Sequence, residues 1–344
     1  MLSQSQFSDE SLESLYRVAD QLQASIKAGK VLSLLEGRLL ACVFMEPSTR
    51  TSCSFMAAIQ RLGGTSILVN EQGSSAKKGE TLEDTMRCLE CYADALVLRH
   101  PVKGSAAKAA AACTKPVLNA GDGVGEHPTQ ALLDVYTMRC ELAAAQRRAV
   151  REGASSSPDS AAVDATEVAI ASATASTSAS ATPTCGELLA GKSIALLGDL
   201  KHGRTVHSLA TLIARNYPSA RLRFVSPAQL AMPQEIKDQV AACGCTFTEH
   251  QDLEQIIGDT DVLYVTRVQK ERFASVEEYE ALKLRYIVTP ATLAQAKPSL
   301  VLMHPLPRVG EINEACDTDP RAAYFRQMEN GMYVRMALLK LILG

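Results

Sequence analysis

The chain has 344 residues, of which 47% are hydrophobic, and a formal net charge of −3. This length allows about two domains with sizeable cores. The slightly negative charge excludes a general attraction to nucleic acid or to anionic membranes, so a site for anions must be a local cluster of cations. No apolar stretch reaches the roughly 18 residues of a membrane span. Residues 1–20 also lack the basic flank and hydrophobic core of a signal peptide, so we expect a cytoplasmic protein.

Ten cysteines raise the question of a metal or redox site. Cys88 and Cys91 form a C-x-x-C pattern, and Cys243 and Cys245 form a C-x-C pattern. The first pair lies in a helical pattern, and neither pair has histidines at the spacing of a zinc site. We therefore expect reduced, mostly buried thiols, no metal and no cofactor.

The first predicted elements are a helix over residues 8–28, a strand ending at Phe44, and a helix from Ser52 to Leu62. The loop before that second helix holds three hydroxyls and one guanidinium, at Ser48, Thr49, Arg50 and Thr51. A helix N-terminus with such donors suits a phosphate dianion. Ser and Thr are also ordinary N-cap residues, so this stretch alone leaves both interpretations open.

A strand over 65–69 leads into the polar stretch 70–81, which contains Ser74, Ser75, Lys77 and Lys78. This stretch is either a solvated surface loop or a cationic arm, and composition does not decide between them.

Two further strands are predicted at 95–98 and 116–119, and polar side chains follow the end of each strand. The first ends at Arg99, and the second precedes the glycine-rich turn 121–125, then His127 and Gln130 at the mouth of a helix over 131–142. Open α/β sheets bind ligands at the carboxyl ends of their strands, so these side chains are candidate ligand contacts.

The alternation of strands and helices predicts a parallel sheet with helices on both faces. It stops near Ala143, and from Ala154 to Thr184 the chain is mainly Ala, Ser and Thr. Such a segment cannot bury a core, so we expect a disordered insertion at about 143–184.

Order resumes with a strand over 192–197, the glycine turn 198–203 and a helix to Asn216. The turn suggests dinucleotide binding, but its spacing does not match G-x-G-x-x-G and no acidic residue ends the following strand at 222–225. The remaining predicted elements are a helix at 234–242, a strand at 246–249, a helix at 253–257, strands at 262–266 and 300–303, and a final helix at 321–343.

The last two strands both end in polar segments. The strand at 262–266 runs into Arg267 and Gln269, and the strand at 300–303 runs into the His304–Arg308 segment H-P-L-P-R. Either X-Pro bond of that segment can be cis. The final helix has an apolar face and is long enough to return to the first domain.

Seven motifs in order resemble those of aspartate transcarbamoylase, across nearly the whole chain except the low-complexity insertion. They are S-T-R-T at 48–51, K-K-G-E-T at 77–81, R-H-P at 99–101, H-P-T-Q at 127–130, G-R-T-V-H-S at 203–208, T-R-V-Q at 266–269 and H-P-L-P-R at 304–308. The resemblance implies transfer of a carbamoyl group from carbamoyl phosphate to L-aspartate, giving N-carbamoyl-L-aspartate and phosphate, an early step of pyrimidine synthesis.

The resemblance also implies an α/β fold of two domains, each a mainly parallel sheet flanked by helices. A carbamoyl-phosphate domain would comprise residues 1–128 and 325–344, with the C-terminal helix returning to it, and an aspartate domain residues 129–324. Two anionic substrates require gathered cations, which agrees with the arginines that the motifs supply.

Each motif residue acquires a role by this resemblance. The phosphate would be held by Ser48, Thr49, Arg50 and Thr51, and the carbamoyl oxygen by Thr51, Arg99 and His127. The carbamoyl nitrogen would meet Gln130 and the carbonyls of Pro305 and Leu306, and the aspartate carboxylates would meet Lys78, Arg204, Arg267 and Gln269. Ser74, preferred over Ser75, and Lys78 would come from a neighbouring subunit of a homotrimer, and the Leu306–Pro307 bond would be cis. No side chain is an obvious general base, so we expect catalysis by positioning and charge stabilisation.

Three alternatives stay open at this point. Ornithine transcarbamoylase shares two of the motifs, but a cationic co-substrate beside Arg204 and Arg267 would be repelled. A catalytically silent scaffold of the same fold and a nicotinamide dehydrogenase are the other two.

Overall fold

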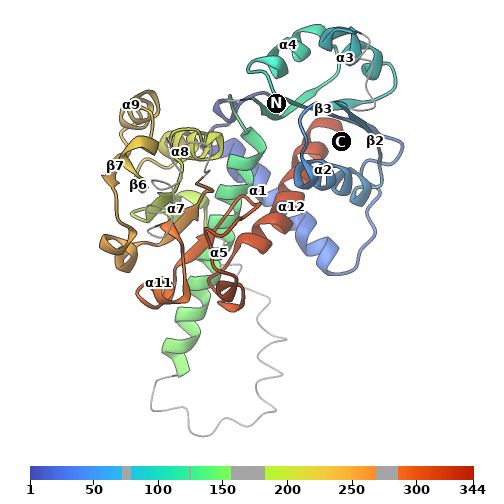
Figure 1. Ribbon diagram of the computed structural model, residues 1–344. Coiled ribbons are helices and arrows are strands. Elements are labelled where there is room, and N and C mark those ends of the chain that lie inside the picture. The colour runs from blue at the N-terminus through green and yellow to red at the C-terminus, as the bar shows by residue number, and fades with distance from the viewer. Residues whose placement is uncertain (72–78, 124, 156–182, 269–285) are drawn as a thin grey trace, which may run out of the picture.

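The computed structural model describes residues 1–71, 79–123, 125–155, 183–268 and 286–344, which form two lobes joined by long helices (Figure 1). Ser74, Ser75, Lys77, Lys78 and Gln269 lie outside the described residues.

The first lobe contains a four-stranded sheet in the order β2-β1-β3-β4, and every neighbouring pair is parallel. Its strands are β1 (Leu39–Phe44), β2 (Thr65–Asn70), β3 (Ala95–His100) and β4 (Val117–Asp122). The helices between them are α2 (Thr49–Arg61), α3 (Leu82–Glu90) and α4 (Ser105–Ala112). The helix α4 is not predicted by periodicity, because its run of alanines has helix propensity but no apolar stripe.

The second lobe contains a five-stranded sheet in the order β7-β6-β5-β8-β9, again parallel throughout. Its strands are β5 (Ser193–Leu197), β6 (Arg221–Val225), β7 (Thr246–His250), β8 (Val262–Val265) and β9 (Val301–Met303). Its helices are α7 (Cys185–Leu189), α8 (Arg204–Asn216), α9 (Gln234–Ala242) and α11 (Pro290–Ala294). The helix predicted at 253–257 is instead two short 3-10 turns, Leu253–Gln255 and Ile257–Asp259. These two parallel sheets confirm the predicted fold class.

Three long helices hold the two lobes together. They are α1 (Asp9–Lys27), α5 (Pro128–Ser155) and α12 (Tyr324–Leu343), and α12 packs against α1, α2 and α5. The predicted return of the final helix to the first domain is therefore confirmed. The helix begins at Tyr324 rather than at Arg321, because residues 321–323 pair with β9 through an isolated bridge at Ala322.

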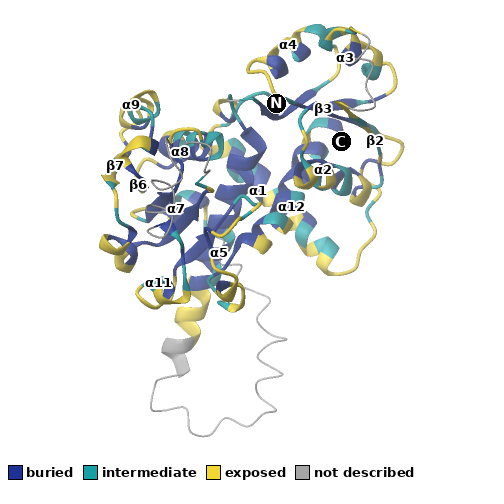
Figure 2. Ribbon diagram, viewed as in Figure 1, coloured by how far each residue is buried: buried dark blue, intermediate teal, exposed yellow. Residues whose placement is uncertain are grey.

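The prediction of a disordered insertion at about 143–184 is wrong for its first residues. α5 continues to Ser155, because the stretch after Leu142 is rich in the helix formers Ala, Glu, Gln and Arg. Figure 2 shows α5 buried where it passes between the lobes and exposed toward its far end. Residues 156–182 lie outside the described part of the chain.

One hydrophobic core cluster runs through both lobes by way of the long helices. It joins Phe55 of α2, Tyr136 of α5, Leu209 of α8 and Leu339 of α12. Because the helix N-termini are fixed by this shared core, side chains from both lobes are held at the junction between them.

The thiols are less buried than expected. All ten are free, but only Cys42, Cys185, Cys245 and Cys316 are buried. Among the described residues, no group of three or more His, Cys, Asp or Glu side chains could hold a metal ion. None of the helices searched in this part of the chain is long and apolar enough to cross a membrane.

Candidate active site

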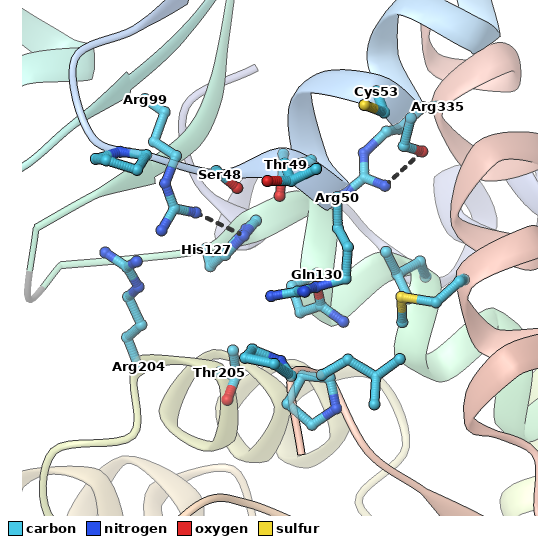
Figure 3. A pocket seen from close by; sticks show the side chains of 18 residues that line it. Ser48, Thr49, Arg50, Cys53, Arg99, His127, Gln130, Arg204, Thr205 and Arg335 are labelled. Carbon is cyan, nitrogen blue, oxygen red and sulfur yellow. Dashed lines mark hydrogen bonds between the residues drawn. The ribbon is translucent and has the colours of Figure 1, made fainter. Parts of the chain in front are cut away.

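A cavity of about 700 Å³ lies at the junction of the two lobes (Figure 3). The N-termini of three helices reach it, from α2 at Ser48–Thr51, from α5 at His127 and Gln130, and from α8 at Arg204 and Thr205. The partial positive charges of three helix ends favour an anion there. The lining residues are Pro47, Ser48, Thr49, Arg50, Thr51, Cys53, Ser54, Arg99, His127, Gln130, Leu133, Arg204, Thr205, Pro305, Leu306, Pro307, Met328 and Arg335.

The N-terminus of α2 is not capped by a side chain. Ser48 occupies the N-cap position but makes no side-chain hydrogen bond to the helix. The helix starts at Thr49, so Thr49, Arg50 and Thr51 form its first turn, where backbone N–H groups have no partner within the helix. The ordinary-cap interpretation is therefore wrong for Ser48, and this end of the helix is available to an anion.

Arg99 reaches the cavity from an irregularity in the sheet. The pairing of β3 with β4 shifts register between Leu98 and His100, which turns the intervening side chain. Arg99 is 8% exposed, and its Nη2 lies 2.9 Å from Glu46 Oε1. Gly121 leaves room for the Arg99 side chain, because its φ is +118° and a Cβ there would lie 3.3 Å from Arg99 Nη1.

His127 lies beside Arg99 at the start of α5, and Figure 3 shows the contact between the two side chains. Arg99 Nη1 is 3.5 Å from His127 Nε2, and the backbone N–H of His127 donates to Ser208 Oγ at 3.2 Å. Burial, followed by the charges of Arg99, Arg204 and Arg335, lowers the pKa of His127 well below its ordinary value. The ring is therefore neutral near neutral pH.

Glu46 joins two arginines of the cavity lining, one from each lobe. Its Oε1 accepts from Arg99 at 2.9 Å and from Arg204 Nη2 at 3.1 Å, while Arg204 Nη1 also donates to the carbonyl of Gly123. Burial alone would raise the pKa of Glu46, but the two arginines outweigh it and lower the pKa. Glu46 is thus ionised and holds two like charges together.

The H-P-L-P segment forms part of the cavity wall. The Leu306–Pro307 bond is cis, as predicted, and Leu306 has a φ of +53°. The backbone N–H of Leu306 donates to His304 Nδ1 at 2.8 Å, and His304 Nε2 lies 2.8 Å from Glu311 Oε1. These contacts place Pro305 and Leu306 on the cavity wall.

Most of the predicted residues that the structure describes meet at this cavity. Arg267 does not, because it is exposed beyond the end of β8 and is absent from the lining. The predictions for Ser74, Lys78 and Gln269 concern positions outside the described residues.

Sequence reasoning missed several residues of the site, above all Glu46, Ser54, Thr205 and Arg335. Arg335 left a signal, since it is a charged residue within the apolar run of the final helix. Its guanidinium is buried, donates to Ser54 Oγ at 2.8 Å, and lies 5.0 Å from the ring centroid of Phe55. Glu46 left no such signal, because a single carboxylate before a proline is ordinary in a turn.

The glycine turn that suggested a dinucleotide site has a packing role. Gly198 has a φ of +117°, and a Cβ there would lie 2.4 Å from the carbonyl oxygen of Thr266. Glycine is required where the two strands end side by side, whether or not a ligand binds.

Comparison with known proteins identifies the family. Residues 1–140 match the carbamoyl-P binding domain, and residues 190–342 the Asp/Orn binding domain, of aspartate/ornithine carbamoyltransferases. The chain belongs to this family. It is 42% identical to a chloroplastic aspartate carbamoyltransferase of Arabidopsis thaliana, over 98% of this chain and 76% of that protein. A solved aspartate transcarbamoylase of Trypanosoma cruzi, in complex with carbamoyl phosphate and aspartate, superposes with a TM-score of 0.82 at 38% identity, covering 100% of this chain and 95% of that chain.

Other relatives are much longer. The chain is 45% identical over 344 residues to the multifunctional protein CAD of Squalus acanthias, of which it covers 13%. It spans between 13% and 16% of the length of the multifunctional curated relatives that it matches.

Proposed function

We propose that the chain is an aspartate carbamoyltransferase, which converts carbamoyl phosphate and L-aspartate to N-carbamoyl-L-aspartate and phosphate in pyrimidine biosynthesis. One observation carries the proposal: three helix N-termini and the side chains of Arg50, Arg99 and Arg204 converge on one cavity in a chain of net charge −3. Such a site suits substrates with several negative charges.

In the proposed reaction, the first turn of α2 and Arg50 hold the phosphate group. Thr51, Arg99 and His127 face the carbamoyl oxygen, where negative charge develops when the neutral aspartate amine attacks the carbonyl carbon. A C–N bond forms, the C–O bond to phosphate breaks, and the departing phosphate takes the proton from the amine. A neutral His127 can orient the oxygen but has no acidic proton to deliver.

The specificity for aspartate rests on charge. Arg204 lines the cavity, and we propose that Arg267 and Gln269 join it when the substrate is bound. A carboxylate suits this arrangement, whereas the ammonium side chain of ornithine would be repelled.

A product assay tests the assignment. The purified protein should form N-carbamoyl-L-aspartate from carbamoyl phosphate and L-aspartate, with no citrulline formed when L-ornithine replaces aspartate. Turnover with ornithine alone would make the chain an ornithine transcarbamoylase. Absence of product with either amine would favour the silent scaffold.

We further propose a cytoplasmic homotrimer in which Ser74 and Lys78 enter a neighbouring site. The proposal rests on the resemblance at 77–81, and mixed trimers test it. Arg50→Ala and Lys78→Ala chains should each be nearly inactive, but their mixture should regain activity where a wild-type Arg50 meets a wild-type Lys78. If a verified mixed trimer stays inactive, the shared site is refuted.

Cell fractionation tests the proposed location in the cytoplasm, since plant relatives are named chloroplastic.

A further inference from the structure

Asp134 is a buried carboxylate one helical turn beyond Gln130 on α5. It is 0% exposed and accepts three hydrogen bonds from neutral groups of three elements. Gln130 Nε2 donates to Oδ1 at 2.9 Å, Gln327 Nε2 of α12 donates to the same oxygen at 2.7 Å, and the Tyr264 hydroxyl of β8 donates to Oδ2 at 2.8 Å. Asp134 itself does not line the cavity.

These contacts fix the orientation of the Gln130 amide. An amide nitrogen is only a donor and an ionised carboxylate only an acceptor, so Nε2 must face Asp134. The acceptor oxygen of Gln130 then turns away from the carboxylate. A flipped amide would set two oxygens against each other, which a buried site disfavours strongly.

The amide of Gln327 is oriented in the same way, and it connects Asp134 to the H-P-L-P segment. With its nitrogen on Asp134, Gln327 presents Oε1 to the backbone N–H of His304, which donates to it at 3.0 Å. His304 in turn accepts from the backbone N–H of Leu306 at 2.8 Å. One carboxylate therefore orients both the Gln130 amide and the segment that carries the carbonyls of Pro305 and Leu306.

The side-chain oxygen of Gln130 and the carbonyl oxygens of Pro305 and Leu306 are hydrogen-bond acceptors, and all three residues line the same cavity. A ligand that satisfies them must present N–H donors, and an NH₂ group has two. A methyl group in the same place would leave buried acceptors unpaired.

We propose that Asp134 is the positioning residue that makes the site select an acyl phosphate bearing NH₂ over one bearing CH₃. It acts through Gln130 and through Gln327 and His304, without touching the substrate. The inference rests on the proposed function, since it concerns the carbamoyl group of that substrate.

The orientation does not depend on the proton of Asp134. Both amides bond to Oδ1, whereas Oδ2 meets a hydroxyl that can donate or accept. Asn at this position can keep its oxygen on the two amides and turn its nitrogen to Tyr264. Asp134→Asn is thus the conservative variant, and Asp134→Ala removes the acceptor.

Two stable isosteres give the test. Phosphonoacetamide and 2-oxopropylphosphonate differ only in NH₂ against CH₃, and calorimetry without aspartate measures both dissociation constants. In Asp134→Ala, the preference for the amide should fall about tenfold or more relative to wild type, mostly through weaker binding of phosphonoacetamide. Asp134→Asn should keep the wild-type preference to within about threefold.

The matched control is Asn330→Ala, which removes another buried hydrogen bond between α12 and α5, from Asn330 Nδ2 to Thr137 Oγ1 at 3.2 Å. It does not touch Gln130, so its preference should equal that of wild type. Gln130→Ala should lower the preference as Asp134→Ala does, and the double variant should lose little more.

The proposal is overturned if Asp134→Ala weakens both ligands equally, or neither, or if Asn330→Ala loses the preference to the same extent. These binding constants do not require turnover. Failure of the product assay with wild type would therefore refute the proposed reaction separately from the role of Asp134.

Discussion

His127 faces the cavity as a neutral ring, because burial and three arginines lower its pKa well below its ordinary value. The unfolded chain binds this proton more readily than the folded one, so folding stability should fall as the pH drops below the ordinary value of 6.5. The carbamoyl oxygen would meet the ring in one protonation state over the whole neutral range.

We predict that the His127 ring does not titrate between about pH 6 and 8. Its resonance, assigned by comparison with His127→Asn, should keep a constant chemical shift in an NMR titration of the labelled protein. A titration midpoint near the ordinary pKa of histidine would contradict the neutral ring. His127→Ala should also lower the turnover number, because removing one donor to a developing oxyanion costs about 2.7–4 kcal/mol.

Arg335 is a buried cation held by hydroxyls rather than by a carboxylate. It donates to Ser54 Oγ at 2.8 Å and to Thr129 Oγ1 at 3.4 Å, and burial lowers its pKa to about 10. The lowered pKa means that burial of the charge opposes folding. Such a cation at the cavity wall favours the binding of an anion there. The burial of this charge therefore lowers folding stability but serves anion binding.

We predict that Arg335→Met weakens the binding of inorganic phosphate by about tenfold while lowering thermal stability little or not at all. The control is Arg139→Met, which removes a buried arginine paired with Asp20 at 2.8 Å, away from the cavity. That variant should lose thermal stability and keep its phosphate affinity. Melting curves with and without phosphate measure both, and the reverse pattern would contradict this role of Arg335.

At the scale of elements, α5 and α12 meet around the carboxylate of Asp134. Burial raises its pKa to about 7, against smaller opposing effects of the hydrogen bonds from Tyr264, Gln327 and Gln130 and of the charge of Arg335. As pH rises from the ordinary value of 3.8 toward 7, the unfolded chain loses this proton before the folded one does. Ionisation of Asp134 therefore opposes folding increasingly over that range.

We predict that the melting temperature of Asp134→Asn, relative to wild type, rises from about pH 4 to about pH 7 and then levels off, because Asn does not titrate. Scanning calorimetry at several pH values measures the difference. If the difference in melting temperature stays constant or falls over that range, the pKa of Asp134 is not raised in the folded protein.

At the scale of the whole molecule, Glu46 links the lobes by holding Arg99 and Arg204 at 2.9 and 3.1 Å. Without its charge, two arginines from different lobes would repel each other. We predict that Glu46→Gln shifts the lobes toward an opened arrangement and lowers kcat/KM for aspartate by at least about tenfold. The control is Glu141→Gln, whose partner Arg326 lies at 2.7 Å and outside the cavity lining. Small-angle scattering should show a larger radius of gyration for Glu46→Gln alone, and equal radii would contradict the prediction.

The sequence predicted most of this organisation where the signal is local. Periodicity located the strands of both sheets, and the motif order led to Ser48–Thr51, Arg99, His127 and Arg204, which the structure brings to one cavity. It did not predict Glu46, Asp134 or Arg335, because most of their partners lie far away in the chain and a lone charged residue leaves no periodic pattern. The extension of α5 to Ser155 was missed for another reason, since strong helix formers there lack an apolar stripe.

The most direct test of the proposed reaction follows the bond that it forms. Carbamoyl phosphate labelled with heavy carbon and L-aspartate labelled with heavy nitrogen are mixed with the protein and observed by NMR. We predict a new signal in which the two labels are directly coupled, together with an equal amount of phosphate. The assignment as an aspartate carbamoyltransferase is wrong if phosphate appears while the labelled carbon is found only in the products of hydrolysis by water. It is also wrong if the labels couple only when labelled ornithine replaces aspartate.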